Sequence, residues 1–160
     1  MSEKSTYVNI LMQSLKKKVA ILEELDRTVF TMEAILKKSD AQVEEIENVE
    51  TKREEALEEL EKADLGFQRI YERVKEEFAE HRYLYEEEIK SMQKMIRKIT
   101  DYTARIQAQE IRNKQLLDSY LQKKKKEVRS FKVQHNSANQ YTRHLANRTG
   151  GQAYFLDDRK

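Results

Sequence analysis

Apolar residues recur along this chain with the spacing of amphipathic helices. Residues 85 to 131 contain neither Gly nor Pro, and steps of four and three residues through them follow one heptad seam. The seam consists of Tyr85, Ile89, Met92, Ile96, Ile99, Thr103, Ile106, Glu110, Asn113, Leu117 and Tyr120. An unbroken helix of this extent would be about 70 Å long, so it needs partner helices along its flank.

The beginning of the chain predicts a helix with two neighbours. One heptad position holds Val8, Leu15, Leu22, Val29 and Leu36, and the other holds Leu11, Lys18, Leu25 and Met32. Met12 and Val19 widen this apolar stripe beyond a single seam. We expect helix 1 over residues 6–38, with Ser5 or Thr6 as its cap.

A first chain reversal is predicted directly after this helix. Lys37 and Lys38 suit the negative end of a helix dipole. Ser39 followed three residues later by Gln42 has the pattern of a capping box for the next helix. Helix 2 is expected over residues 40–78, with a thin seam.

The second reversal has two candidate positions. Gly66 gives a break signal at 64–66, but helical spacing resumes immediately after it. A reversal near residues 79–82 would instead make helix 2 about as long as helix 1, and we favour this later position. Helix 3 is then expected over residues 82–134.

These elements predict an all-α protein, either an elongated antiparallel helical hairpin or a three-helix bundle. Residues 1–134 would form a single bundle whose long last helix projects beyond the first two. Residues 135–160 are rich in polar residues and Gly, so we expect them to form a flexible, client-binding tail.

Composition supports a narrow helical core. The chain has 160 residues, 38% charged and 38% hydrophobic, with no Pro, Cys or Trp. The absence of Cys excludes disulfides and thiolate metal sites. No apolar run is long enough to cross a bilayer and no signal-peptide pattern is present, so we expect a cytoplasmic protein without membrane insertion.

Charge is strongly segregated along the chain. Residues 1–39 carry a net charge of +2, residues 40–90 carry −10, and residues 91–160 carry +10. In an antiparallel bundle the acidic middle segment would lie beside part of the basic third one, which favours one register. The basic run at 123–126 points around a helix rather than along one face, so we expect no nucleic-acid partner.

The sequence gives little indication of catalysis. It contains no Gly-rich phosphate loop, no metal-binding spacing and no nucleophile elbow. His81, His135 and His144 are scattered singly, and the paired acids lie on solvated helix faces, where nothing would raise a carboxyl pKa. We therefore expect a protein that is not an enzyme and has no catalytic, cofactor-binding or metal-binding residues and no cofactor.

Candidate binding residues lie toward the end of the chain. Beyond the expected partner helices, apolar groups continue at helical spacing, and isolated aromatic residues follow in the polar tail. The proposed contact strip is Leu117, Tyr120, Leu121, Val128 and Phe131, and the proposed tail anchors are Tyr141, Tyr154 and Phe155. The alternatives are that these groups mediate dimerisation, fold back on the tail, or belong to an inert terminus.

The order of these features resembles the FlgN/FliT-type flagellar export chaperones of bacteria. The resemblance is carried by the Lys-Arg-Glu-Glu-Ala-Leu stretch at 52–57 and by Glu-Ile-Arg-Asn-Lys-Gln-Leu-Leu at 110–117, which is similar to the family's polar-Asn-x-x-Leu-Leu run. Tyr141 and the Tyr-Phe-Leu-Asp-Asp stretch at 154–158 resemble the tails of versions from Gram-positive bacteria. Nearly the whole chain is covered, with motifs of low specificity.

The resemblance implies a cytoplasmic chaperone for flagellar type III export. Such proteins lack ATPase activity and keep hook-associated proteins or the filament cap soluble until export. They bind amphipathic C-terminal helices of these clients with their last helix and tail. Export-gate or ATPase components are further expected partners.

Two alternatives remain open from the sequence. One is a stalk component of the export apparatus that resembles the FliJ-type antiparallel coiled coil and binds an ATPase ring. The other is a homodimeric coiled-coil scaffold.

Overall fold

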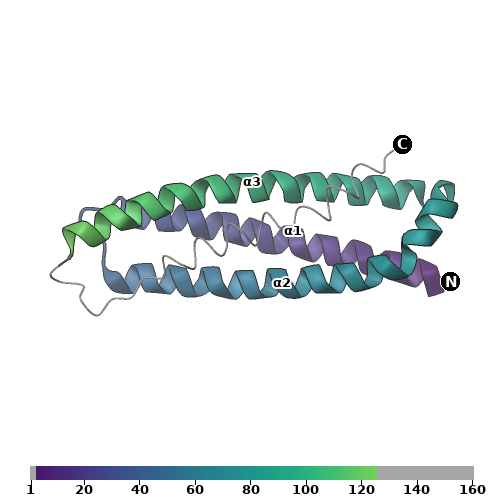
Figure 1. Cartoon of the computed structure of the whole chain (residues 1–160), viewed down its shortest axis with the longest axis horizontal. Helices are drawn as coiled ribbons and strands as arrows, with labels where there is room; N and C mark the ends of the chain where they lie inside the picture. Colours follow the sequence, from purple (N-terminus) through teal and green to yellow (C-terminus); the bar gives the residue numbers. More distant parts are fainter. Residues whose placement is uncertain (1–2, 126–160) are drawn as a thin grey trace.

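The chain folds into an elongated antiparallel bundle of three helices. The computed structural model describes residues 3–125, in which α1 spans Glu3–Leu36, α2 spans Val43–Glu80 and α3 spans Glu86–Lys123. A short 3-10 helix, η1, occupies Arg82–Tyr85 between α2 and α3. Figure 1 shows the three long helices side by side. The expected all-α class is confirmed, in its three-helix form.

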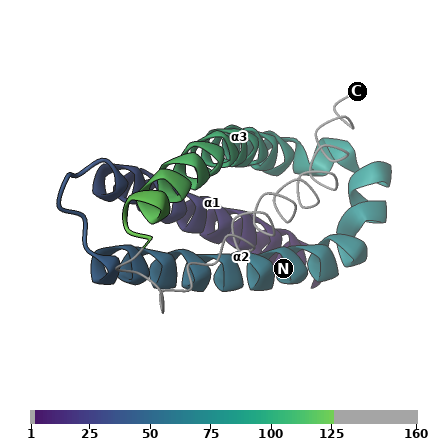
Figure 2. The same ribbon diagram turned by 60° about the vertical axis from the view of Figure 1, so that its left-hand side comes forward.

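α1 is the central helix of the bundle. It packs along both α2 and α3. Within the described residues, the backbones of α2 and α3 come close to each other at few positions (Figure 2). The wide stripe of α1 explains this arrangement, because Leu15 and Leu22 are buried while Met12 packs from the side as a partly buried residue. A helix with two apolar flanks can bury both only between two neighbours.

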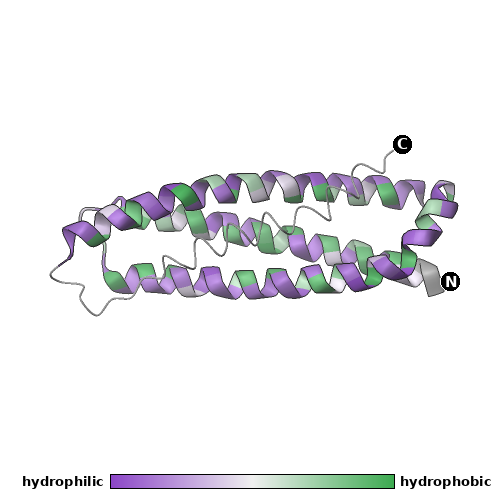
Figure 3. Cartoon of the chain, viewed as in Figure 1, coloured by the Kyte–Doolittle hydropathy of each residue, from purple (hydrophilic) through white to green (hydrophobic). Residues whose placement is uncertain are grey.

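Most of the core is one continuous apolar cluster, which we call the main cluster. It includes Leu11, Leu15, Leu22 and Leu25 of α1, Leu60, Phe67, Val74 and Phe78 of α2, and Met92, Ile96, Ile99 and Ile106 of α3. Figure 3 shows apolar positions recurring along each helix between polar ones. The predicted seams of α1 and α3 therefore form the contact faces.

The first reversal occupies residues 37–42, but the capping box is not formed. Gln42, not Ser39, is the N-cap of α2, and it makes no side-chain cap. Its amide instead donates to the carbonyl oxygen of Asp40 at 2.9 Å. Lys38 pairs with Glu45 across the connection, with 2.7 Å between Nζ and Oε2. α2 begins three residues later than expected, so Ser39 is too far ahead of its first turn to cap it.

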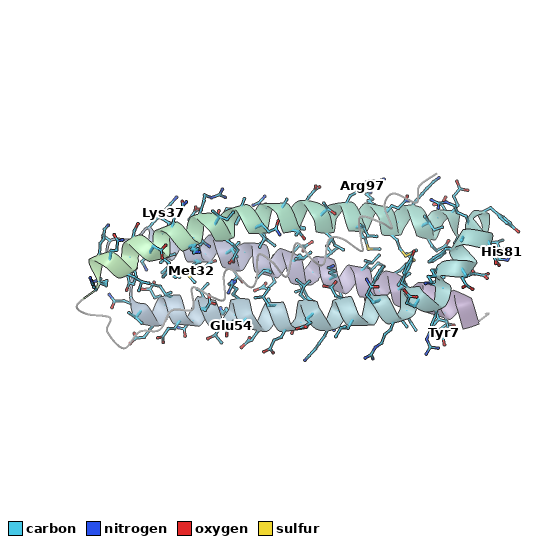
Figure 4. The ribbon with its side chains drawn as sticks, viewed as in Figure 1. Tyr7, Met32, Lys37, Glu54, His81 and Arg97 are labelled. Carbon is cyan, nitrogen blue, oxygen red and sulfur yellow. The ribbon has the colours of Figure 1, made fainter. Side chains whose placement is uncertain are left out.

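α2 continues through Gly66 without a break, and the chain reverses at residues 81–85. Gly66 does not adopt a positive φ angle, so its backbone is that of an ordinary helical residue. The later of the two candidate reversals is therefore the one that the structure contains. Figure 4 places His81, at this reversal, at the same end of the bundle as Tyr7 of α1.

α3 is shorter than the sequence predicted. The expected continuous helix from Tyr85 to Phe131 begins at Glu86, because Tyr85 belongs to η1, and α3 ends at Lys123. α2 and α3 each have 38 residues, which at 1.5 Å per residue is about 57 Å. Tyr120, about one turn before the end of α3, is buried against the first reversal, so the described part of α3 packs on its own chain almost to its end.

The helical conformation at Gly66 predicts that Gly66→Ala stabilises the protein. A Cβ atom built at Gly66 meets no atom within 4 Å, so the methyl group costs no steric energy. Removing the conformational freedom of Gly from a helix interior should raise the free energy of unfolding by about 0.5–1 kcal/mol. Urea denaturation followed by circular dichroism measures the change.

The control for this measurement is Gln68→Ala, at an exposed position of the same helix. Gln and Ala both favour the helical conformation, so Gln68→Ala should change the free energy of unfolding by about 0.4 kcal/mol at most. A loss of stability in Gly66→Ala would show that the chain turns at this position.

Candidate partner-binding site

Three of the eight predicted contact residues lie in the described part of the chain. Leu117, Tyr120 and Leu121 are in the last turns of α3. The other five lie outside the described residues: Val128, Phe131, Tyr141, Tyr154 and Phe155.

The three described residues pack on their own chain at one end of the bundle. This loop end comprises the end of α1, residues 37–42, the start of α2 and the end of α3, which lie together in Figure 1. Its buried residues form a second apolar group, the loop-end cluster: Met32, Leu36, Ala41, Ile46, Val49 and Tyr120. Ile35, Leu116, Leu117 and Leu121 pack against it and are partly buried. Figure 4 shows Met32 inside this end of the bundle.

Tyr120 is the residue that holds the end of α3 to the first reversal. It is 8% exposed, and its hydroxyl donates to the carbonyl oxygen of Ala41 at 3.2 Å. The expectation that Tyr120 projects into solvent is therefore wrong. Leu117 and Leu121 flank it and retain some exposed apolar surface.

A layer of buried polar groups lies between the two apolar clusters. Arg53 of α2 reaches Glu110 of α3, with 3.0 and 3.2 Å from its Nε to the two carboxylate oxygens. Its Nη1 donates to Glu50 at 2.7 Å. The side chains of Arg53 and Glu110 are 4% and 5% exposed. The Arg53 guanidinium therefore spans the gap between the backbones of α2 and α3.

Amide groups extend this layer to α1. Asn113 donates to the carbonyl oxygen of Val29 at 2.8 Å and accepts from Gln109 at 2.9 Å. Arg112 donates to the Gln109 side-chain oxygen at 2.6 Å. We call Gln109 and Asn113, together with Glu50, Arg53 and Glu110, the polar layer, and Arg112 lies at its exposed edge. The polar layer fixes the register of the three helices through two interhelical contacts, because Arg53 with Glu110 joins α2 to α3 and Asn113 with Val29 joins α3 to α1.

Burial dominates the titration of both carboxyls in the polar layer. Burial raises the pKa of Glu110 above its ordinary value, and Arg53 opposes this. The same two causes act in the same directions on the pKa of Glu50. Both groups share one guanidinium, so neither carboxylate is fully compensated.

A second buried ion pair interrupts the main cluster. Lys18 of α1 lies 2.6 Å from Asp64 of α2, and their side chains are 3% and 6% exposed. The sequence already marked Lys18 as a break in the first seam, and Glu110 and Asn113 as polar members of the third. Their partners could not be read from the sequence, because pairs such as Arg53 with Glu110 are 57 residues apart.

Other kinds of site find no geometric support in residues 3–125. This part of the chain holds no group of three or more His, Cys, Asp or Glu side chains placed to bind a metal ion. Its helices are not apolar over a stretch long enough to cross a lipid bilayer. Glu86 and Glu87 are exposed in the first turn of α3, and Glu88 is partly buried there.

No protein-family model, curated protein or solved structure matches the chain.

The polar layer predicts a large difference between a single and a double substitution. Arg53→Met leaves Glu110 buried without its cation, so the free energy of unfolding should fall by about 3 kcal/mol. Adding Glu110→Leu removes one of the two carboxyls left without Arg53 and adds apolar packing, so the double variant should recover most of this loss, while Glu50 accounts for the remainder. Urea denaturation measures both values.

The control is Arg27→Met, which removes the exposed ion pair with Glu24 and should have no measurable effect on the free energy of unfolding.

Glu110 also predicts a specific pH dependence of stability. Its folded-state pKa is raised above 4.5, so its favourable contribution is complete at lower pH and is lost as pH rises through the folded-state pKa. As pH rises from about 4.5 through the folded-state pKa of Glu110, the free energy of unfolding of the parent should therefore fall relative to that of Glu110→Gln. Urea denaturation of both proteins across a pH series measures the difference, and parallel curves would contradict the prediction.

Proposed function

We propose that this protein is a cytoplasmic chaperone for flagellar type III export. It binds the amphipathic C-terminal helices of hook-associated or filament-cap proteins and keeps these clients soluble. The observation that carries the proposal is the half-buried apolar surface at the end of α3. Leu117 and Leu121 flank Tyr120 there, and the chain continues from this point toward Val128 and Phe131.

The chemistry of this surface suits an amphipathic helix. Apolar side chains at positions 117, 120 and 121 have the spacing of a helix face that pairs with another helix. Lys123 and the lysines after it add positive charge beside that face, while α2 supplies many exposed carboxylates. A client helix with apolar residues on one face and mixed charges at its edges would complement both.

Two of the segments that carry the family resemblance meet in the described part of the chain. Residues 52–57 lie in α2 and residues 110–117 lie in α3, and Arg53 joins them through its ion pair with Glu110. These residues support the proposal because they hold the end of α3 in register beside α2. The polar layer thus has a role in placing the contact strip.

The arrangement of three helices favours a chaperone over an export-apparatus stalk. A stalk that resembles an antiparallel coiled coil needs two long helices, whereas here α3 packs on α1 along the bundle. Export-gate or ATPase components remain further proposed partners of the chaperone. No nucleic-acid partner is proposed, because the acidic surface of α2 would repel a polyanion.

The proposal predicts that Val128→Asp with Phe131→Asp weakens client binding. Two carboxylates would replace apolar contacts, and the affinity for a peptide comprising the C-terminal helix of a hook-associated protein should fall at least about tenfold. Isothermal titration calorimetry with the full chain measures the dissociation constant.

The control for this experiment is Leu65→Asp, which places a carboxylate at a residue that is 50% exposed on α2. This variant should bind the peptide as the parent does. Equal affinity of the parent and the Val128/Phe131 double variant would remove these two residues from the contact strip. Absence of binding by the parent would overturn the chaperone proposal.

A further inference from the structure

The two apolar clusters of the bundle differ greatly in size. The main cluster extends through all three helices from Val8 to Val29 on α1, and from Ile89 to Ile106 on α3. The loop-end cluster has only six buried members, of which Ala41 is a single methyl group. Burial of apolar area is the main source of stability in a bundle, so the loop end is held far less strongly than the rest.

The polar layer prevents the two clusters from supporting each other. On α1 the main cluster ends at Val29 and the loop-end cluster begins at Met32; on α3 the corresponding residues are Ile106 and Tyr120. Between them on α3 lie Glu110 and Asn113, both buried. A buried ion pair adds little net stability compared with apolar packing, because desolvation offsets its attraction. The layer is therefore a point of weak coupling across the bundle.

The ion pairs that close the loop end lie near solvent. Tyr120 donates a buried hydrogen bond to Ala41, whereas Lys38 pairs with Glu45 at partly exposed positions. Glu33 of α1 lies near Lys37 at 3.6 Å and near Arg112 at 3.9 Å, both long ion pairs. Exposed ion pairs of this kind contribute little to stability.

We infer that the loop end opens as one unit while the main bundle stays folded. The opening separates the last turns of α3 from residues 32–49 and exposes Leu117, Tyr120 and Leu121 together. Its use in taking up a client helix rests on the proposed function, but the opening itself does not. Leu117, Tyr120 and Leu121 would thus become available to a partner by local opening.

Hydrogen exchange measured by mass spectrometry on the full chain, without any partner, tests this inference. Peptides from residues 32–49 and 113–121 should exchange at one common rate, at least about tenfold faster than peptides from residues 8–29 and 89–106. Simple fraying would instead give a steady gradient of rates toward Leu36 and Lys123. Such a gradient, or equal protection of both regions, would overturn the inference.

A pair of matched double variants tests the role of the polar layer. Arg53→Met with Glu110→Leu joins the two clusters by apolar packing, so exchange at the loop end should slow at least about tenfold. Lys18→Met with Asp64→Leu makes the same kind of change inside the main cluster and should leave loop-end exchange unchanged. Equal effects of the two double variants would overturn the assignment of the layer as the point of opening.

The same proteins separate this inference from the proposed function. A common fast rate at the loop end, with no binding of the hook-associated peptide, would support the opening and overturn the chaperone proposal. If the parent binds the peptide but its loop end is as protected from exchange as the main bundle, the chaperone proposal would be supported and the opening would be overturned. If both hold, the Arg53/Glu110 double variant should bind the peptide at least about tenfold more weakly than the parent.

Discussion

The bundle depends on the double-width apolar stripe of α1. A helix with a single heptad seam could be satisfied by one partner, and the chain would then be a hairpin. Because Met12 and Val19 extend the stripe of α1 beyond its two heptad positions, it can be covered only by two helices on two sides. This explains why α2 and α3 are both organised around α1 and are joined to each other mainly by long side chains such as Arg53.

Sequence periodicity predicted the helix faces well, since it reports directly on burial. Every apolar member of the predicted α1 seam is buried, and so are the polar members Thr103, Glu110 and Asn113 of α3. The identity of their partners depends on how distant segments meet, which no local pattern contains. Lys18 illustrates the limit: it interrupts the first seam in the sequence, and it is buried because Asp64 lies opposite.

The position of helix ends was harder to predict than helix faces. Helical spacing of apolar residues continues past residue 123, so periodicity alone extended α3 to residue 134 and created an overhang. Gly66 gave a break signal, but α2 continues through it to the later reversal that helix length favoured. In both cases tertiary contacts decide, and for α3 the last such contact on its seam is that of Tyr120 with the first reversal. Among the candidate site residues that the structure describes, Tyr120 is buried instead of exposed, and Leu117 and Leu121 are partly buried.

The antiparallel order of the helices has a consequence for probes attached to the chain. α1 begins at the end of the bundle where the chain reverses between α2 and α3, and it runs through 34 residues to the loop end, a distance of about 51 Å. A tag or dye joined ahead of Glu3 would sit at the pole opposite Tyr120. Such a label could report on the rotational diffusion of the whole protein without contacting a partner bound at the loop end.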